Sequence, residues 1–470
     1  MNMKHVFGGI ALAFTVGSSA VLAAPSAGEV AKLGVSGTEL TPNGAIRAGN
    51  AEGTIPEWTG GITEVPDGFE WPNYVNPYKD DEILFTITAD NYQDYEDKLT
   101  DGQVKMFETY PETFKMNIYP TRRSWSAPDW VYDKTIKHAA DTTLDSNGDD
   151  PVNHWGGGLC FPLPQNGAEA RLNMDPRRCN YYGKRENVWY NHTLVDQSGS
   201  TQTTAIQYWN YKPMDAKGAP PPDRDSEAYD PNWYVMFQTF APPRQAGQGI
   251  LFIADINYDA PSGGEDTWIY NPGQRRVLRS PQVKYDFPFP GSNGMLTTDQ
   301  AFTGTQGDIN RYNYEMKAKR EVFVPYNSYQ LADRGLSEED VIGENHISPE
   351  LLRYELHRVI PVVATLKDEF THIYSKRVFY ADEDSFWNMA TDLYDQEGNL
   401  WRYEENYTMN FYDYPLFHRL MEGKYDFRSG YVVELLDVEE PAQPRSFNDR
   451  AGDFKADFYG IGNLKSMGIR

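Results

Sequence analysis

The second half of the chain repeats one pattern that restricts the fold more than any other feature of the sequence. Runs of β-branched and aromatic residues alternate with turn signals such as Asp382-Glu383-Asp384, at the spacing of an antiparallel meander. One helix, predicted at Glu350–His357 behind a Ser348-Pro349 cap, interrupts them. We therefore expect an α+β fold, a large curved antiparallel sheet with helices against one face. The predicted strands are Trp233–Phe240, Ile250–Ile256, Thr267–Tyr270, Arg275–Arg279, Arg311–Met316, Lys319–Val324, Val359–Leu366, His372–Tyr380, Phe386–Tyr394 and Leu400–Met409.

The first half of the chain is less regular. Residues 25–80 are rich in Gly, Pro, Thr and Asn, which predicts an extended arm laid over a body, with Trp58 and Trp71 as anchors. A helix within Ala89–Tyr110 should break and restart near Thr100, because Thr100 and Gln103 have capping-box spacing. Residues 140–232 are predicted to be loop-rich insertions. We expect residues 81–470 to form a single α+β domain that includes them.

The N-terminus has the three parts of a secretory signal peptide. Lys4 and His5 precede an apolar run from Val6 to Val16, and small residues follow up to Ala24. The run is too short to span a bilayer. We expect residues 1–24 to be the signal peptide, cleaved near Ala23 or Ala24, and the mature protein to be soluble and periplasmic.

The charge of the chain excludes some classes of partner. The 43 basic and 68 acidic residues give a formal net charge of −25. Nucleic acid requires a basic face, so we expect no nucleic-acid binding. Stable adsorption to anionic lipid surfaces is also disfavoured.

The two cysteines, Cys160 and Cys179, are expected to form a disulfide because an exported protein folds in an oxidising compartment. A loop of about twenty residues closed in this way contributes roughly 3 kcal/mol on the chain-entropy model. A catalytic thiol is not expected, since no neighbouring histidine supplies a base in sequence.

Motifs that carry catalysis are absent from the sequence. It contains no G-x-S-x-G, H-E-x-x-H, G-x-x-x-x-G-K or G-x-G-x-x-G. The histidines are scattered without metal-ligand spacing, and the paired carboxylates Glu404-Glu405 and Asp382–Asp384 are typical of solvated faces. Asp145–Asp150 resembles a calcium loop, but its sixth position is Asp150 and its twelfth is Gly156. We expect no enzyme, no cofactor and no metal site, with an ion at Asp145–Asp150 left open.

Asp266–Pro281 predicts a β-hairpin with aromatic residues on one arm and arginines on the other. Trp268 and Tyr270 lie on the first arm, Asn271-Pro272-Gly273 forms the turn, and Arg275 and Arg276 begin the second arm. Such a hairpin could line an apolar groove and hold an anionic head group. It could equally be a solvated edge hairpin in an acidic protein.

Aromatic residues are also in excess in the strands after residue 386. An excess of this kind can form the wall of a cavity for a hydrophobic or sugar ligand, or it can pack under helices. Strand parity leaves open which alternate residues point inward.

Several long stretches of the chain resemble a proteobacterial family of exported proteins of unknown function, often labelled outer-membrane lipoprotein-sorting proteins and related in fold to LolA, LolB and RseB. The matching stretches cover nearly all of the mature chain. They are Gly53–Gly61, Tyr119–Ser124, Phe161–Ala170, Trp268–Pro281, Lys319–Tyr329, Tyr354–Val359 and Arg377–Asp384. One departure follows Ala170, where Arg171–Cys179 replaces the aromatic-rich W-N-H stretch of the family.

The resemblance implies a half-open antiparallel β-barrel whose concave face is closed by helices around an apolar cavity. Relatives of that fold carry acyl chains or lipoproteins through the periplasm. The family is expected to act beside inner-membrane exporters of the resistance-nodulation-division type and outer-membrane proteins. Fold alone does not establish any of these roles.

The first hypothesis is a periplasmic carrier for a lipid-like hydrophobic molecule, with an aromatic wall and arginines for an anionic head. Its predicted ligand-binding residues are Trp268, Tyr270, Phe323, Phe379, Trp387, Trp401 and Tyr403 for the wall, and Arg122, Arg275 and Arg276 for the head. A non-catalytic structural adaptor of an envelope export complex is the alternative. A secreted carbohydrate-active protein is a third possibility, because exposed aromatic side chains can stack on sugars.

Overall fold

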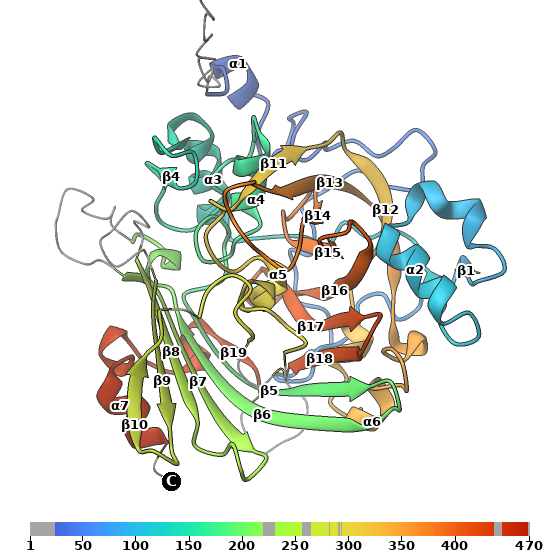
Figure 1. Ribbon diagram of the computed structural model, residues 1–470. Coiled ribbons are helices and arrows are strands. Elements are labelled where there is room, and N and C mark those ends of the chain that lie inside the picture. The colour runs from blue at the N-terminus through green and yellow to red at the C-terminus, as the bar shows by residue number, and fades with distance from the viewer. Residues whose placement is uncertain are drawn as a thin grey trace, which may run out of the picture.

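The computed structural model describes residues 24–219, 231–255, 265–281, 283–289, 292, 294–436 and 444–468. Within them, seventeen strands form one sheet (Figure 1). Its strands are β1 (Phe85–Ile87), β2 (Met116–Ile118), β5 (Arg185–Asp196), β6 (Thr201–Tyr211), β7 (Pro231–Ala241), β8 (Gly249–Asp255), β9 (Glu265–Asn271), β10 (Arg276–Arg279), β11 (Tyr312–Met316), β12 (Arg320–Pro325), β13 (Tyr354–Leu366), β14 (Lys376–Asp382), β15 (Asn388–Tyr394), β16 (Leu400–Phe411), β17 (Leu416–Asp426), β18 (Gly430–Leu436) and β19 (Ser446–Phe447).

The helices are few and short. They are α1 (Ala27–Val30), α2 (Asp101–Thr109), α3 (Asp129–Asp141), α4 (Gly167–Asn173), α5 (Ala301–Gly304), α6 (Glu338–Val341) and α7 (Ile461–Met467). A separate two-stranded sheet joins β3 (Thr143–Leu144) to β4 (Pro151–Val152). The longest described helix, α3, has 13 residues, well short of the length needed to cross a bilayer.

The large sheet is open. Antiparallel pairing runs from β10 through β9, β8, β7, β6 and β5 to β18, and on through β17, β16, β15 and β14 to β13. Both β11 and β12 pair along the other side of β13, and β2 touches its first residue. Within the described residues no pairing joins β10 to this far edge. The predicted large, curved, open antiparallel sheet is confirmed.

Two parts of the sequence prediction differ from the structure. The predicted helix Glu350–His357 is wrong: Ser348-Pro349 starts only a short 3-10 turn over Pro349–Leu351, and strand β13 begins at Tyr354. Pairing with β12 and β14 on both sides outweighs the weak local helix signal. The region predicted to be loop-rich also contains β5 and β6, the long strands in the middle of the sheet.

Both faces of the sheet are covered along its middle strands, and β16 shows how its alternate residues divide between them. Tyr403, Glu405 and Tyr407 face α2, where Gly102 is required because a Cβ would lie 1.9 Å from the Tyr403 ring. The predicted restart at Thr100 is confirmed, since Thr100 and Gln103 form a complete capping box at the start of α2. Glu404, which lies between Tyr403 and Glu405, faces the hollow of the sheet, where it accepts a hydrogen bond from Gln300.

A segment of mostly irregular chain between β10 and β11 fills that hollow. Figure 1 shows α5, which belongs to this segment, at the centre of the curved sheet. We call the described residues 283–289, 292 and 294–310 the cover. Helices α2 and α7 lie on the outer side of the sheet. The concave face is thus closed mainly by irregular chain with one short helix.

The predicted disulfide is present. Cys160 and Cys179 are bonded and fully buried, and they pack with Phe161 and Leu172 under α4. The bond closes a loop with a sequence separation of 19 residues, which reduces the conformational freedom of the unfolded chain.

Replacing both cysteines by serine should therefore lower the free energy of unfolding by about 3 kcal/mol. Urea denaturation of the oxidised protein and of the double variant measures the difference. Reduction of the unmodified protein should cause a loss of the same size. A loss below about 1 kcal/mol in both would show that the loop is already ordered in the unfolded state.

Candidate functional site

The half of the hollow formed by β5 to β8 is apolar and is occupied by rings of the cover. Phe302 lies 5.0 Å from the Trp233 ring and 6.0 Å from the Tyr208 ring, centroid to centroid. Phe289 and Leu296 are buried in the same cluster. The cavity that remains beside these residues measures about 10 Å³, which is about the size of one water probe. The apolar wall is therefore already filled by the chain itself.

The half formed by β14 to β17 is polar and holds the same segment by hydrogen bonds. Gln300 Nε2 donates to Glu404 Oε1 at 2.7 Å, and Lys424 Nζ donates to the Gln300 carbonyl at 2.7 Å. The Thr303 amide donates to Glu422 Oε1 at 3.1 Å. Because these groups are buried, each hydrogen bond offsets the cost of removing a polar group from water.

The backbone of the cover is strained where its apolar and polar ends meet. Phe302 and Thr303 have φ values of 51° and 64°, in the left-handed region that favours glycine. Strain of this kind costs about 1–3 kcal/mol per residue and persists only where surrounding contacts enforce it. The contacts of the Phe302 ring and of the Thr303 amide therefore keep the segment in place against its own backbone preference.

Glu404 is a fully buried carboxyl group in this site. Burial raises its pKa to about 7, while Lys424 and the Gln300 hydrogen bond oppose the rise. The folded protein therefore holds a proton on Glu404 over a pH range where the unfolded chain has released it. Ionising the buried Glu404 carboxyl lowers the free energy of unfolding. This loss is absent near pH 4, where the group is protonated in both states, and is complete above about pH 7.

The variant Glu404→Gln should consequently gain stability over the unmodified protein as the pH rises from 5 to 8, by up to about 3 kcal/mol. Gln keeps the Oε1 acceptor for Gln300. Chemical denaturation at several pH values measures the difference, and the exposed Glu397→Gln is the control that should show none. If the difference in free energy of unfolding between Glu404→Gln and the unmodified protein stays constant from pH 5 to 8, the raised pKa of Glu404 is contradicted.

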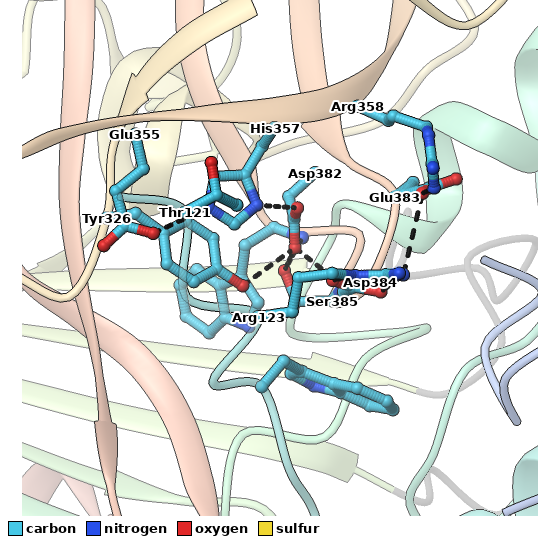
Figure 2. Close-up of polar contacts among 12 residues, drawn as sticks. Thr121, Arg123, Tyr326, Glu355, His357, Arg358, Asp382, Glu383, Asp384 and Ser385 are labelled. Carbon is cyan, nitrogen blue, oxygen red and sulfur yellow. Dashed lines mark hydrogen bonds and ion pairs between the residues drawn. The ribbon is translucent and has the colours of Figure 1, made fainter. Parts of the chain in front are cut away.

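A second buried cluster joins the N-terminal arm to the sheet (Figure 2). Arg123 donates from Nε and Nη2 to the two oxygens of Asp384, at 2.9 and 2.6 Å. Its Nη2 also donates to the Ile46 carbonyl, and its Nη1 donates to the Arg47 carbonyl. Arg358 pairs with Glu383 at 2.7 Å and donates to the Ala48 carbonyl. The arm is thus held through its backbone by two arginines that are themselves fixed by carboxylates.

His357 lies at the centre of this cluster. Its Nε2 lies 3.1 Å from Glu355 Oε2, its Nδ1 lies 3.7 Å from Asp382 Oδ1, and its ring stacks on Tyr326 at 3.8 Å. Figure 2 shows Asp382 between this ring and Ser385. Burial and the charge of Asp384 raise the pKa of Asp382 to about 6.

Among the described residues, His357, Asp382 and Asp384 offer the ligand atoms that could hold a metal ion, one each, within 4.8 Å of one another. The chemistry of the neighbours opposes a cation there. Arg123 already occupies both oxygens of Asp384, and a second cation beside it would be repelled. The cluster fits charge pairing that fixes the arm better than it fits a metal.

Replacing Arg123 by Met should lower the free energy of unfolding by about 3–5 kcal/mol, because it leaves the buried Asp384 carboxylate without its partner. The neighbouring Arg122→Met is the matched control. Arg122 pairs with Asp81 at the surface, where an ion pair contributes about 0–1 kcal/mol. Urea denaturation measures the free energy of unfolding of both variants. Equal losses would show that the buried Arg123–Asp384 pair stabilises the fold no more than the surface pair.

The residues predicted to bind a ligand are spread over several parts of the molecule. Trp268 and Tyr270 lie in the cluster under α7, on the outer side of the sheet, whereas their neighbour Ile269 packs against the inner cluster. Phe323, Trp387 and Tyr403 are buried in the large cluster on the side of α2 and the arm.

The other predicted residues also lie apart from the inner apolar cluster. Phe379 packs near α4, with the Arg171 guanidinium 5.0 Å from its ring. Trp401 is half-buried between Arg402 and Arg428. Arg275 and Arg276 are exposed in the hairpin, and Arg122 pairs with Asp81. Their roles in binding stay predictions.

The sequence interpretation missed the buried carboxylates. Glu404-Glu405 and Asp382–Asp384 were expected on solvated faces, but all five side chains are buried. Glu405 accepts hydrogen bonds from Tyr403, Tyr407 and Tyr354. For Glu404-Glu405 the available signal was their position inside the predicted strand Leu400–Met409, since a charge there needs a buried partner when both sheet faces are covered. Asp382–Asp384 was predicted as a turn and gave no such signal. The Asp145–Asp150 loop is closed by its own backbone, with Asp145 Oδ1 accepting from three amides.

Comparison with known proteins gives one family and several relatives. A family model described as "Protein of unknown function (DUF1329)" matches residues 86–464. An uncharacterized protein of Pseudomonas aeruginosa is 36% identical over 471 residues, covering 98% of this chain and 97% of that protein. A solved DUF1329 family protein from Desulfovibrio piger is 13% identical and covers 63% of this chain and 97% of its own, with a TM-score of 0.42. The LolA superfamily protein NE2245 from Nitrosomonas europaea is 11% identical and covers 64% and 99%, with a TM-score of 0.35.

Proposed function

The chain belongs to the DUF1329 family of proteins of unknown function, as its sequence motifs indicated, and we propose that it is an exported, non-enzymatic carrier for a lipid-like hydrophobic molecule. Its binding surface in this proposal is the apolar half of the concave face, between β5 and β8. The cover occupies that surface when no ligand is bound and leaves it when a ligand enters.

One observation carries the proposal: the apolar wall is sealed by a strained segment. Phe289 and Phe302 reach into the wall from the cover, not from the sheet. The backbone at Phe302 and Thr303 stores about 1–3 kcal/mol per residue that is released when the segment leaves. An acyl chain or a ring system can fill the same volume and recover the apolar burial that the two phenylalanines give up.

The charged groups beside the wall provide a place for a polar head group. Arg419 lines the small cavity next to Phe302, with its guanidinium 5.2 Å from that ring. An anionic head would meet this guanidinium once the ring has moved away. Arg122, Arg275 and Arg276 are the alternative head-group residues predicted from the sequence, and they lie at the surface.

The compartment and the partners of the carrier follow from the sequence alone. The signal-peptide pattern of residues 1–24 supports export to the periplasm. An inner-membrane exporter of the resistance-nodulation-division type and an outer-membrane protein are the partners that the family resemblance implies. They remain predictions.

A structural adaptor is the second candidate function, and the filled concave face favours it. In this alternative the cover is permanent and the molecule acts through its surface. The edge strand β10 pairs only with β9 among the described strands, and its Leu278 is 52% exposed between two exposed arginines. An edge of this kind can accept a strand from a partner.

The variant Phe302→Ala should bind a fluorescent fatty acid such as cis-parinaric acid roughly tenfold or more tightly than the unmodified protein. Removing the ring weakens the closed state, so less of the ligand's binding energy is used to open it. Fluorescence titration measures the dissociation constants, and thermal unfolding shows whether the variant is folded.

Two control variants separate this site from others. Leu464→Ala removes a buried apolar side chain from α7 on the outer side, so it tests whether general loosening raises affinity. Trp268→Ala tests the wall predicted from the sequence. If Trp268→Ala weakens fatty-acid binding and the other two variants leave it unchanged, the binding site lies at the β9–β10 hairpin. If neither the unmodified protein nor Phe302→Ala binds any fatty acid, the carrier proposal is wrong and the adaptor is favoured.

A further inference from the structure

A larger cavity lies outside the concave face, beside α3 and the disulfide. It measures about 360 Å³ and is lined by both polar and apolar residues, among them Thr142, Asp145, Phe161 and Glu169. Ala24 and Pro25, the first residues of the described chain, line it as well. The cavity therefore lies where the predicted signal peptide ends.

Two residues that line this cavity each have a buried side-chain oxygen without a hydrogen-bond partner. The two oxygens are Thr142 Oγ1 and Asp145 Oδ2. The other Asp145 oxygen accepts the amides of Gly148, Asp149 and Asp150 at 2.9, 3.0 and 3.2 Å, which orients the carboxylate and leaves Oδ2 directed elsewhere. A buried carboxylate oxygen that lacks a donor is costly unless a cation or donor reaches it.

The neighbouring charged side chains do not provide that cation. Lys134 and Lys137 of α3 both lie over the Trp155 ring, at 5.0 and 4.9 Å. Arg178 pairs with Asp150 and Asp308. Burial lowers the pKa of His138 to about 4, so its ring is neutral at pH 7. Among the described residues, no lysine, arginine or histidine forms an ion pair with Asp145.

We propose that this cavity is the binding site for the protein's own mature N-terminus. Cleavage by a signal peptidase adds water across the Ala23–Ala24 peptide bond: the C–N bond breaks, the Ala23 carbonyl carbon gains the hydroxyl oxygen, and the Ala24 nitrogen becomes an ammonium group. That ammonium donates to Asp145 Oδ2 and Thr142 Oγ1. It is the cation that the cavity lacks, and it arises on a residue that already lines the cavity.

This inference rests on the proposed export, and it adds a consequence to it. The uncleaved chain carries a neutral peptide group at Ala24, which cannot compensate the Asp145 charge. The exported and processed form is therefore the more stable one, because processing creates the ion pair that links the N-terminus to the loop after α3.

The test uses the full precursor, exported in a Gram-negative host and purified from its periplasm. Intact mass first shows whether the chain begins at Ala24. The variant Asp145→Asn keeps the Oδ1 acceptor for the three amides and removes only the charge. The control is Asp141→Asn, an exposed carboxylate four residues earlier. Each is studied with a free α-amine and after selective acetylation of that amine.

With a free amine, Asp145→Asn should lower the melting temperature by roughly 2–4 °C and Asp141→Asn should leave it unchanged. After acetylation, the unmodified protein should fall to the same level and Asp145→Asn should cause no further loss. The α-amine of the unmodified protein should also acetylate several-fold more slowly than that of Asp145→Asn.

Two different results would overturn the inference. An intact mass that includes residues 1–23 would remove the export proposal and this site with it. A chain that begins at Ala24, in which Asp145→Asn lowers the melting temperature equally with and without acetylation, would overturn the site alone. A mature chain that begins at Pro25 and shows the same coupling would keep the site and move the ammonium by one residue.

Discussion

Along β13 to β17 both faces of the large sheet are largely covered, and most other features of the structure follow from that constraint. A strand with two buried faces has no solvated side for its charged residues, so each charge must meet a partner inside the molecule. On the outer side, Glu405 is satisfied by three tyrosine hydroxyls. Asp384 and Glu383 are paired with Arg123 and Arg358, whereas Asp382 accepts hydrogen bonds from Ser385 and Tyr326. On the inner side, Gln300 of the cover donates to Glu404. Glu422 is paired with Arg419 and Lys424 of β17 and also accepts the Thr303 amide of the cover. The cover is therefore a structural requirement of β14 to β17 as well as a filling for β5 to β8.

The same constraint explains which parts of the fold could be predicted from the sequence. Strands β7 to β16 were recognised, apart from the start of β13 that was predicted as a helix, because aromatic and β-branched runs end at clear turn signals. The Thr100 capping box marked the start of α2 correctly. Strands β5 and β6 were missed because they contain polar residues such as Asn187, Asn191 and Thr204, which interrupt the apolar runs. Buried on both sides, these strands lack the alternation that marks a half-exposed strand.

The site was less predictable than the fold. Trp268 and Tyr270 were the most conspicuous aromatic pair, but strand parity places them under α7 while Ile269 faces the hollow. A shift of one residue in the assumed parity reverses every assignment on a strand. Phe302 could not be found by any periodic pattern, because it lies in irregular chain with a left-handed backbone that depends on distant contacts. The charged cluster at His357 joins segments more than 200 residues apart, which no local signal reveals.

The central claim is that the cover leaves the apolar wall when a hydrophobic ligand binds. Hydrogen–deuterium exchange at the Thr303 amide measures this directly, because that amide donates to Glu422 only while the cover is in place. On addition of a saturating fatty acid, the account predicts faster exchange at Thr303 and unchanged exchange in α7. Equal or slower exchange at Thr303 with ligand bound would contradict it, since the ligand would then bind without displacing the segment.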